Sequence, residues 1–238
     1  MTHLVESFVN CDVTHNNTFE TSTDGVSWST TTIAAGYHRF TAYMNLLSAA
    51  VPDYTFSYNA TTDRVNITPA GVGTLYFRFT ESLAKTLGFL FATTGKFIHP
   101  ASGDFGPAGI VPLKSVSFLD STPANQSKLA QYAHGRARGV AFGKGIHHKA
   151  KLMASYSDLD RLMSGPCTTG HIRIGPSSAT TGYSSTNLGG YVEGHIVRVG
   201  SPTSLDTIEG LAELELGIHG NAYTAPVETS ASALMFDP

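Results

Sequence analysis

The chain has 238 residues, which is enough for one large β domain or for two domains of ordinary size. Charged residues make up only 14% of it, well below the share in an average soluble chain, so Glu, Lys and Arg are too few for many exposed helices. A formal net charge of −3 at pH 7 excludes the large basic excess of a dedicated nucleic-acid-binding protein. This composition predicts a mainly β fold, with antiparallel sandwich-like sheets and two or three short helices.

The first predicted elements are a hairpin and a helix. Residues 8–32 are polar and rich in Thr, and the pair Asp24-Gly25 is typical of a tight hairpin turn, so we expect strands on both sides of it. Apolar side chains then recur at helical spacing, which predicts a helix with Thr41 as its N-cap and Pro52 as its stop. The side chains on one face of this helix are Phe40, Tyr43, Met44 and Leu47.

Strands return after this helix. The stretch YTFSYNATTDRVNITP alternates polar and apolar residues on both sides of a polar turn and predicts a β-hairpin. GTLYFRFT predicts a further strand and runs into ESLAKTLGF, a helical turn that ends at Gly88. We group these elements in an N-terminal α+β module, residues 1–95.

Gly and Pro are dense between Thr93 and Pro112, and both residues interrupt helices and sheets. We therefore predict a Gly/Pro-rich linker or a long loop at 96–112 and a β-rich domain at 113–238. One helix is predicted in this domain, at 154–165, closed by Gly165 and Pro166. The predicted strands are 113–120, 170–175, 189–200 and 211–220.

The stretch HGRARGVAFGKGIHHKAK, from His134 to Lys151, is basic and contains no acidic residue. Its glycines fit neither the Walker nor the dinucleotide-binding pattern. Small residues alternate with larger ones from 137 to 143, as in a strand that lets another sheet or chain approach closely. We interpret it as an interface strand whose charges meet acidic groups of a neighbour, with phosphate binding as the weaker alternative. The candidate interface residues are Arg136, Arg138, Lys144, His147, His148, Lys149 and Lys151.

No metal or cofactor site is predicted. Adjacent strand residues point to opposite faces, so His147 and His148 cannot share one ion without a bend. Cys11 and Cys167 lack a partner spacing for zinc and are expected to be reduced thiols. The other histidines, at 3, 15, 38, 99, 134, 171, 195 and 219, are scattered, and the sequence leaves open whether folding brings them together.

No catalytic residue is predicted either. The sequence contains no serine elbow and no Cys-His signature of a nucleophile and its base. Two acidic pairs have the spacing of solvated helix or strand faces rather than of glycosidase carboxylates; they are Asp158 with Asp160 and Glu213 with Glu215.

Residues 31–89 resemble a module of tail, fibre and other virion structural proteins of bacteriophages and related viruses. The resemblance is carried by the turn AAGYH, the helix at 40–50, the hairpin at 54–68 and the closing phrase LAKTLGF, about a quarter of the chain. It implies a small core of helix against hairpin, closed by Leu83, Leu87 and Phe89, in which no residue performs chemistry.

We therefore predict a structural virion subunit, of tail or baseplate type, that self-associates and docks to neighbouring virion proteins. The alternative is a receptor- or carbohydrate-binding module of the same particle, using Tyr183, Tyr191 and the loop SSATTGYSSTN. A third hypothesis, against which the sequence argues, is a hydrolase built from convergent His, Asp and Glu residues. The opening MTHLVESFVN does not resemble a signal peptide and no run of about 18 apolar residues occurs, so we expect assembly in the host cytoplasm, without a membrane partner.

Overall fold

The computed structural model describes residues 2–13, 16–70, 75–89, 94–97, 101–131, 137–165, 170–183, 187–206 and 210–221. Strands dominate these residues, with three short helices among them. Every pairing between named strands is antiparallel. The predicted mainly β fold is thus confirmed. No helix in this part of the chain is long and apolar enough to cross a membrane.

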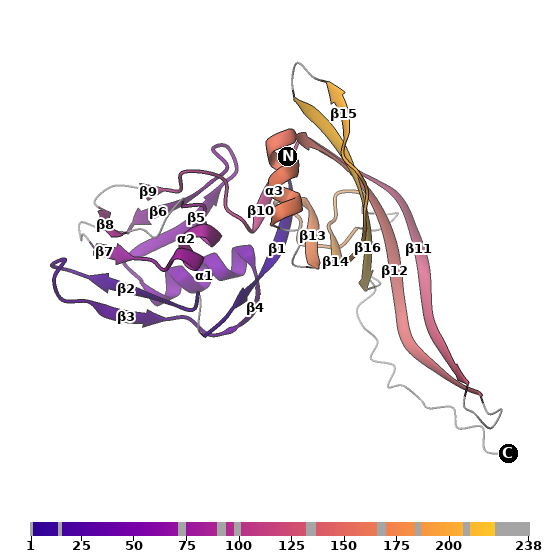
Figure 1. Cartoon of the computed structure of the whole chain (residues 1–238), viewed down its shortest axis with the longest axis horizontal. Helices are drawn as coiled ribbons and strands as arrows, with labels where there is room; N and C mark the ends of the chain where they lie inside the picture. Colours follow the sequence, from indigo (N-terminus) through magenta and orange to yellow (C-terminus); the bar gives the residue numbers. More distant parts are fainter. Residues whose placement is uncertain are drawn as a thin grey trace.

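Two small sheets form the N-terminal unit, at the left of Figure 1. The strands of the first are, in spatial order, β3 (Ser29–Thr32), β2 (Thr18–Ser22), β7 (Leu75–Arg78) and β8 (Thr94–Phe97). Those of the second are β5 (Tyr54–Asn59), β6 (Arg64–Pro69) and β9 (Ala101–Ser102). The predicted hairpins are confirmed, because β2 pairs with β3 on both sides of Asp24-Gly25 and β5 pairs with β6.

Helices α1 (Phe40–Ala50) and α2 (Glu81–Leu87) belong to the same unit, and both confirm their predicted positions. The hydroxyl of Thr80 accepts a bond from the N–H of Leu83 and so caps α2, and Gly88 ends it with a left-handed φ of 86°. The predicted cap of α1 is wrong. Its N-cap residue is Arg39, which makes no side-chain capping bond, and Thr41 lies inside the helix.

An aromatic core fills the N-terminal unit. Phe77 of β7 lies 6.1 Å from Phe19 of β2 and 6.0 Å from Phe56 of β5, measured between ring centroids, so rings from both small sheets meet. Phe79 adds a third side of this cluster, 5.6 Å from Phe77. The four residues predicted for the inner face of α1 are buried in the same core, as are Leu83, Leu87 and Phe89.

The large sheet occupies the other half of Figure 1. Its strands are, in spatial order, β10 (Ile110–Leu113), β1 (His3–Cys11), β13 (His171–Pro176), β14 (Val192–Val199), β16 (Leu211–Asn221), β12 (Ala137–Ser155) and β11 (Ser115–Gln131). Two further strands pair with strands inside this order: β4 (Gly36–Arg39) pairs with β1, and β15 (Thr203–Asp206) pairs with β16.

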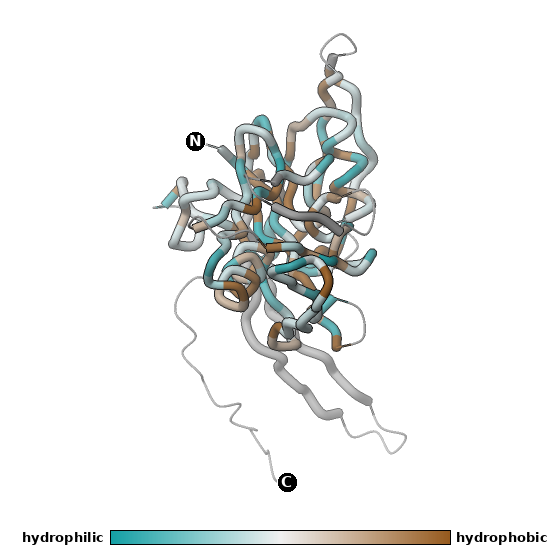
Figure 2. Tube along the Cα trace, turned by 90° about the vertical axis from the view of Figure 1, so that its left-hand side faces the viewer, coloured by the Kyte–Doolittle hydropathy of each residue, from teal (hydrophilic) through white to brown (hydrophobic). Residues whose placement is uncertain are grey.

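One face of the large sheet is apolar and carries helix α3 (Tyr156–Ser164). Leu159 and Leu162 of α3 are buried with Leu152, Leu214 and other aliphatic side chains of the sheet. The predicted helix at 154–165 is confirmed, with Ser155 as its N-cap. Figure 2 shows hydrophobic residues gathered within the body of the molecule, consistent with these two cores.

Strand β1 belongs to both halves of the molecule. Its first five residues pair with β13 and its last four with β4, and Val5 is buried in the core under α3 while Leu4 is buried in the aromatic core. The large sheet therefore draws a strand from each side of the predicted linker. Of the segment 96–112, part is strand, because β9 pairs with β6 and β10 pairs with β1. The division into residues 1–95 and 113–238 stays a prediction.

Candidate functional site

The basic stretch forms part of a long hairpin. Strands β11 and β12 have 17 and 19 residues and pair with each other along their length. Strand β16 accompanies β12 only from Gly145 to Ser155, so the ribbon continues past the end of β16 and leaves the body of the molecule (Figure 1). Of the candidate interface residues, Arg136 lies outside the described residues, and Arg138 and Lys144 are placed on β12 by their backbone alone.

The other four candidates alternate between the faces of β12. His148 is buried at 2% exposure, on the face that carries the apolar core, whereas His147 and Lys149 are exposed. Lys151 is also exposed and pairs with Glu213 of β16, with 2.5 Å between Nζ and Oε2. The expectation that His147 and His148 point to opposite faces is thus confirmed, and His148 has no access to a neighbour.

A row of charges crosses the opposite face of the large sheet, toward the N-terminal unit. Register places Glu6 of β1 opposite Arg173 of β13, and Arg173 opposite Glu193 of β14. Directly opposed residues of an antiparallel pair lie on the same face, so these three side chains adjoin one another. Glu6 and Arg173 are buried, with exposed fractions of 5% and 8%.

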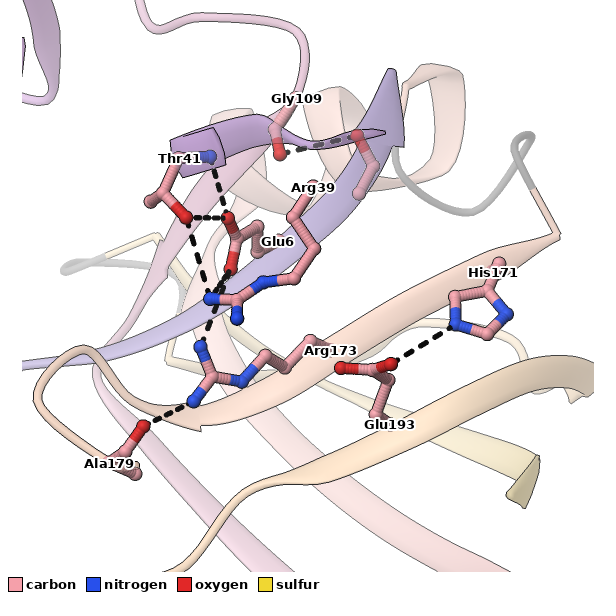
Figure 3. Close-up of polar contacts among 9 residues, drawn as sticks. Glu6, Arg39, Thr41, Gly109, His171, Arg173, Ala179 and Glu193 are labelled. Carbon is pink, nitrogen blue, oxygen red and sulfur yellow. Dashed lines mark hydrogen bonds and ion pairs between the residues drawn. The ribbon is translucent and has the colours of Figure 1, made fainter. Parts of the chain in front are cut away.

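Glu6 replaces the missing helix cap. One carboxylate oxygen, Oε1, accepts bonds from the backbone N–H and the hydroxyl of Thr41, at 2.8 and 2.7 Å. The other, Oε2, lies 3.1 Å from Nη2 of Arg39 and 3.7 Å from Nη1 of Arg173 (Figure 3). A carboxylate at a helix N-terminus is stabilised by the helix dipole. Because both oxygens are engaged, Glu6 is placed to hold α1 on the sheet rather than to act as a base.

Arg173 is held from three sides. Its Nη2 donates to the carbonyl of Ala179, and its guanidinium carbon lies 3.8 Å from the ring centroid of Tyr191. Burial, and next the charge of Arg39, lower the pKa of Arg173. Arg39 and Arg173 both lie beside the carboxylate of Glu6, and Glu193 adjoins Arg173 on the next strand.

A cleft of about 550 Å³ opens over this junction. Glu6, Arg39 and Arg173 line it together with apolar side chains of the N-terminal unit, such as Met44 and Phe56. The two arginines and the apolar lining suit a molecule that carries an acidic group next to an apolar part.

Three of the scattered histidines meet His147 of the basic stretch on this face of the large sheet. His171 of β13 is opposite His195 of β14, His195 is opposite His219 of β16, and His219 is opposite His147 of β12. The ring centroids of His171 and His195 are 4.6 Å apart, and those of His147 and His219 are 4.8 Å apart. We call these four residues the histidine row. No sequence spacing indicated it, because its four members come from four different strands that only the register aligns.

The tyrosines of the glycan-binding alternative already have contacts within the chain. Tyr183 packs on Phe118, with 4.5 Å between ring centroids, and Tyr191 lies under the guanidinium of Arg173. The guanidinium covers one face of the Tyr191 ring, so only the other face is left for a sugar.

Cys11 is a buried free thiol, and burial raises its pKa, which disfavours the reactive thiolate; Cys167 lies outside the described residues. Among the described residues, no three His, Cys, Asp or Glu side chains are grouped to share a metal ion. Comparison with family models, with curated proteins and with solved structures finds no match for this chain. The virion resemblance of residues 31–89 therefore stays a prediction.

Proposed function

We propose that the chain is a structural subunit of a virion, of tail or baseplate type, which works by self-association and by docking to neighbouring proteins. The resemblance of residues 31–89 supports the virion context. The β11–β12 hairpin supports the assembly role and carries the proposal.

The hairpin needs a partner for two physical reasons. A two-stranded ribbon by itself is marginally stable in water. Strand β16 pairs with one edge of β12 from Gly145 to Ser155. Among the described residues, no strand pairs with this edge from Ala137 to Lys144, and such unpaired edges favour pairing with another chain. A neighbouring subunit that covers the ribbon removes both problems.

Charge complementarity favours a second copy as the neighbour. The stretch from His134 to Lys151 has five Arg and Lys residues and no acid, whereas the whole chain has a net charge of −3. The remainder of the chain is therefore more acidic than the whole, and a basic ribbon laid on the body of another copy meets opposite charge.

The test compares the full chain with a variant whose hairpin is shortened. Ala124 and Gly145 are opposed in the ribbon, so replacing residues 125–144 with Asn-Gly joins them by a two-residue turn. We expect the full chain to form a discrete ring or other closed oligomer in light scattering and electron microscopy, and the shortened variant to be a folded monomer. A full chain that stays monomeric over a wide concentration range, or a shortened variant that assembles equally well, would contradict the proposal.

Point variants test the role of charge. Arg138→Glu combined with Lys144→Glu reverses two charges of the ribbon. We expect this variant to assemble more weakly than the wild-type chain, and its assembly to depend less on salt concentration. Arg64→Glu is the matched control, because Arg64 is an exposed cation on β6, in the N-terminal unit. Equal loss of assembly in both variants would indicate a general charge effect and not an interface on the ribbon.

A further inference from the structure

The cleft over the junction has a polar rim. Strand β5, the first turns of α1 and the end of β13 supply much of its lining. The rim consists of five exposed residues with hydroxyl or amide side chains: Thr41, Asn45, Thr55, Ser57 and Ser177. The hydroxyl of Thr41 is bonded to Glu6, but the other four side chains make no hydrogen bond within the part of the chain that the structure describes. These four groups are donors and acceptors open to a ligand.

Arg39 adds a charged donor to the cleft. Its Nη2 bonds to Glu6 and to Thr41, at 3.1 and 3.4 Å, whereas its Nη1 bonds to no other described residue (Figure 3). The side chain of Arg39 is 35% exposed, so a ligand in the cleft has access to the guanidinium. A guanidinium binds carboxylates well. A preference for an acid depends on this donor and not on net charge, since Glu6 and Glu193 balance the two arginines in number.

The rest of the lining is apolar. Met44 and Phe56 are buried beneath the cleft surface, and the half-buried ring of Tyr58 also lines it, with its hydroxyl already donated to Asp63. The carbon skeleton of a ligand can pack on these side chains, while the rim bonds its polar groups. A long alkyl chain would cover the rim without bonding it, which costs free energy. A sugar ring supplies both hydroxyls for the rim and C–H groups for the apolar lining.

We propose that the cleft binds a sugar that carries a carboxylate, of the uronic or sialic acid class. The carboxylate accepts from Nη1 of Arg39, and the ring hydroxyls bond to the rim. The cleft volume of about 550 Å³ is in the usual range for small-ligand sites. Tyr183 and Tyr191 do not line the cleft, so this site differs from the tyrosine loop considered from the sequence. The proposal goes beyond the assembly role and does not depend on it.

Glucuronate and N-acetylneuraminate are the probes, titrated into the full chain and followed by ligand-observed NMR, which detects weak binding. Glucose is the matched neutral probe, because it has a hydroxymethyl group where glucuronate has its carboxylate. We expect both acids to bind, and glucose to bind about 10-fold more weakly than glucuronate through loss of the bond to Arg39. Decanoate, an acid with an alkyl chain, tests the lipid-like alternative and should bind more weakly than either sugar acid.

Arg39→Gln tests the acid preference. It removes the charge, and we expect the affinity for glucuronate to fall to that for glucose, while the affinity for glucose stays the same. Arg78→Gln is the matched control, because Arg78 is also paired with a glutamate, Glu20, but does not line the cleft. This control should keep the preference for glucuronate. Circular dichroism checks that both variants are folded.

Asn45→Trp tests the location of the site. Asn45 is an exposed rim residue of α1, so a tryptophan there fills part of the cleft without entering the core, and it should abolish binding of all three sugars. Thr30→Trp, at an exposed position of β3 outside the cleft, should leave binding unchanged.

Four results would overturn the proposal. Failure of both sugar acids to bind the wild-type chain would exclude an acidic sugar as the ligand. Equal binding of glucose and glucuronate would exclude recognition of the carboxylate. Tighter binding of decanoate than of the sugar acids would make the cleft a lipid site. Undiminished sugar binding by folded Asn45→Trp would place the site elsewhere.

Discussion

The N-terminal unit and the large sheet solve the same packing problem with different side chains. The core of the N-terminal unit is aromatic, with Phe19, Phe56, Phe77 and Phe79 in mutual contact between two small sheets. The core under α3 is aliphatic, built from Ala, Val, Leu and Ile on one face of the large sheet. In the N-terminal unit, large rings fill the space between two small sheets of short strands. Under α3, smaller aliphatic side chains let a nine-residue helix lie close to an extended sheet.

The opposite face of the large sheet is different again, because it is polar and joins the two regions. Glu6 fastens α1 to β1 and β13 on this face. On the other face, Arg161 of α3 reaches Asp63 of the β5–β6 turn, with 2.5 Å between Nη1 and Oδ2, and so also joins the two regions. Polar bonds at the junction are directional and few. We therefore expect the loss of one such bond to weaken the coupling of the two regions more than the loss of a single apolar contact does. Four experiments test this contrast.

The largest expected effect is the loss of a ring from the aromatic core. Phe77→Ala should lower the free energy of unfolding by about 3–5 kcal/mol, and Leu214→Ala in the aliphatic core by about 2–5 kcal/mol. Trp28, the single tryptophan, lies beside Arg78 of the N-terminal unit, so its fluorescence reports that unit, while circular dichroism reports both. If the regions unfold separately, Phe77→Ala shifts the fluorescence midpoint alone; a common shift of both signals would show one cooperative unit.

A pH effect is expected from the buried histidine of the large sheet. Burial, and next the charge of His147, lower the pKa of His148 to about 4, whereas the unfolded chain has the ordinary value near 6.5. Between pH 4 and pH 6.5 this histidine binds more protons in the unfolded state than in the folded state. The contribution of neutral His148 to the free energy of unfolding is therefore fully present above pH 6.5 and is lost as the pH falls toward 4, by up to about 3 kcal/mol.

Urea midpoints at pH 7, 5 and 4 measure this loss. In His148→Leu, which places an apolar side chain opposite Ile218, the drop between pH 7 and 4 should shrink. His38→Leu is the control, since the hydrogen bond of His38 to Ala34 is exposed. An unchanged acid profile in His148→Leu would count against this prediction.

The junction should come next in size. Glu6→Gln removes the charge that binds Thr41, Arg39 and Arg173, and we expect a loss of roughly 1.5–3 kcal/mol, the range for hydrogen bonds to charged groups. The midpoints of the fluorescence and circular dichroism transitions should also lie further apart in this variant than in the wild-type chain. Glu20→Gln breaks an exposed pair with Arg78 within one unit and is the matched control. If both variants behave alike, Glu6 does not couple the regions.

The smallest effect is expected at the exposed pair of Lys151 and Glu213. Lys151→Met should change the free energy of unfolding by less than about 1 kcal/mol, because partly exposed ion pairs contribute little. Assembly measured by light scattering then separates two roles of Lys151. Weaker assembly at unchanged stability would place this residue in an interface, and unchanged assembly would confine it to the pair with Glu213.

Local patterns were sufficient for most elements of this fold. The spacing of Phe40, Met44 and Leu47 placed α1, the pair Asp24-Gly25 placed the first hairpin, and Gly88 placed the end of α2. These signals depend on neighbours within a few residues, which the sequence displays directly. The cap of α1 was missed because its capping carboxylate, Glu6, is 35 residues away from Thr41 in the chain.

The sequence by itself determined the fold class, the two hairpins of the N-terminal unit, the helices and the basic character of β12, since periodicity and turn residues act locally. Only the tertiary structure decided which strands lie side by side. Strand order places Glu6 beside Arg173, and register brings His171, His195, His219 and His147 into one row. Both depend on pairings between residues far apart in the chain, which are set by the burial of one sheet face and not by any motif.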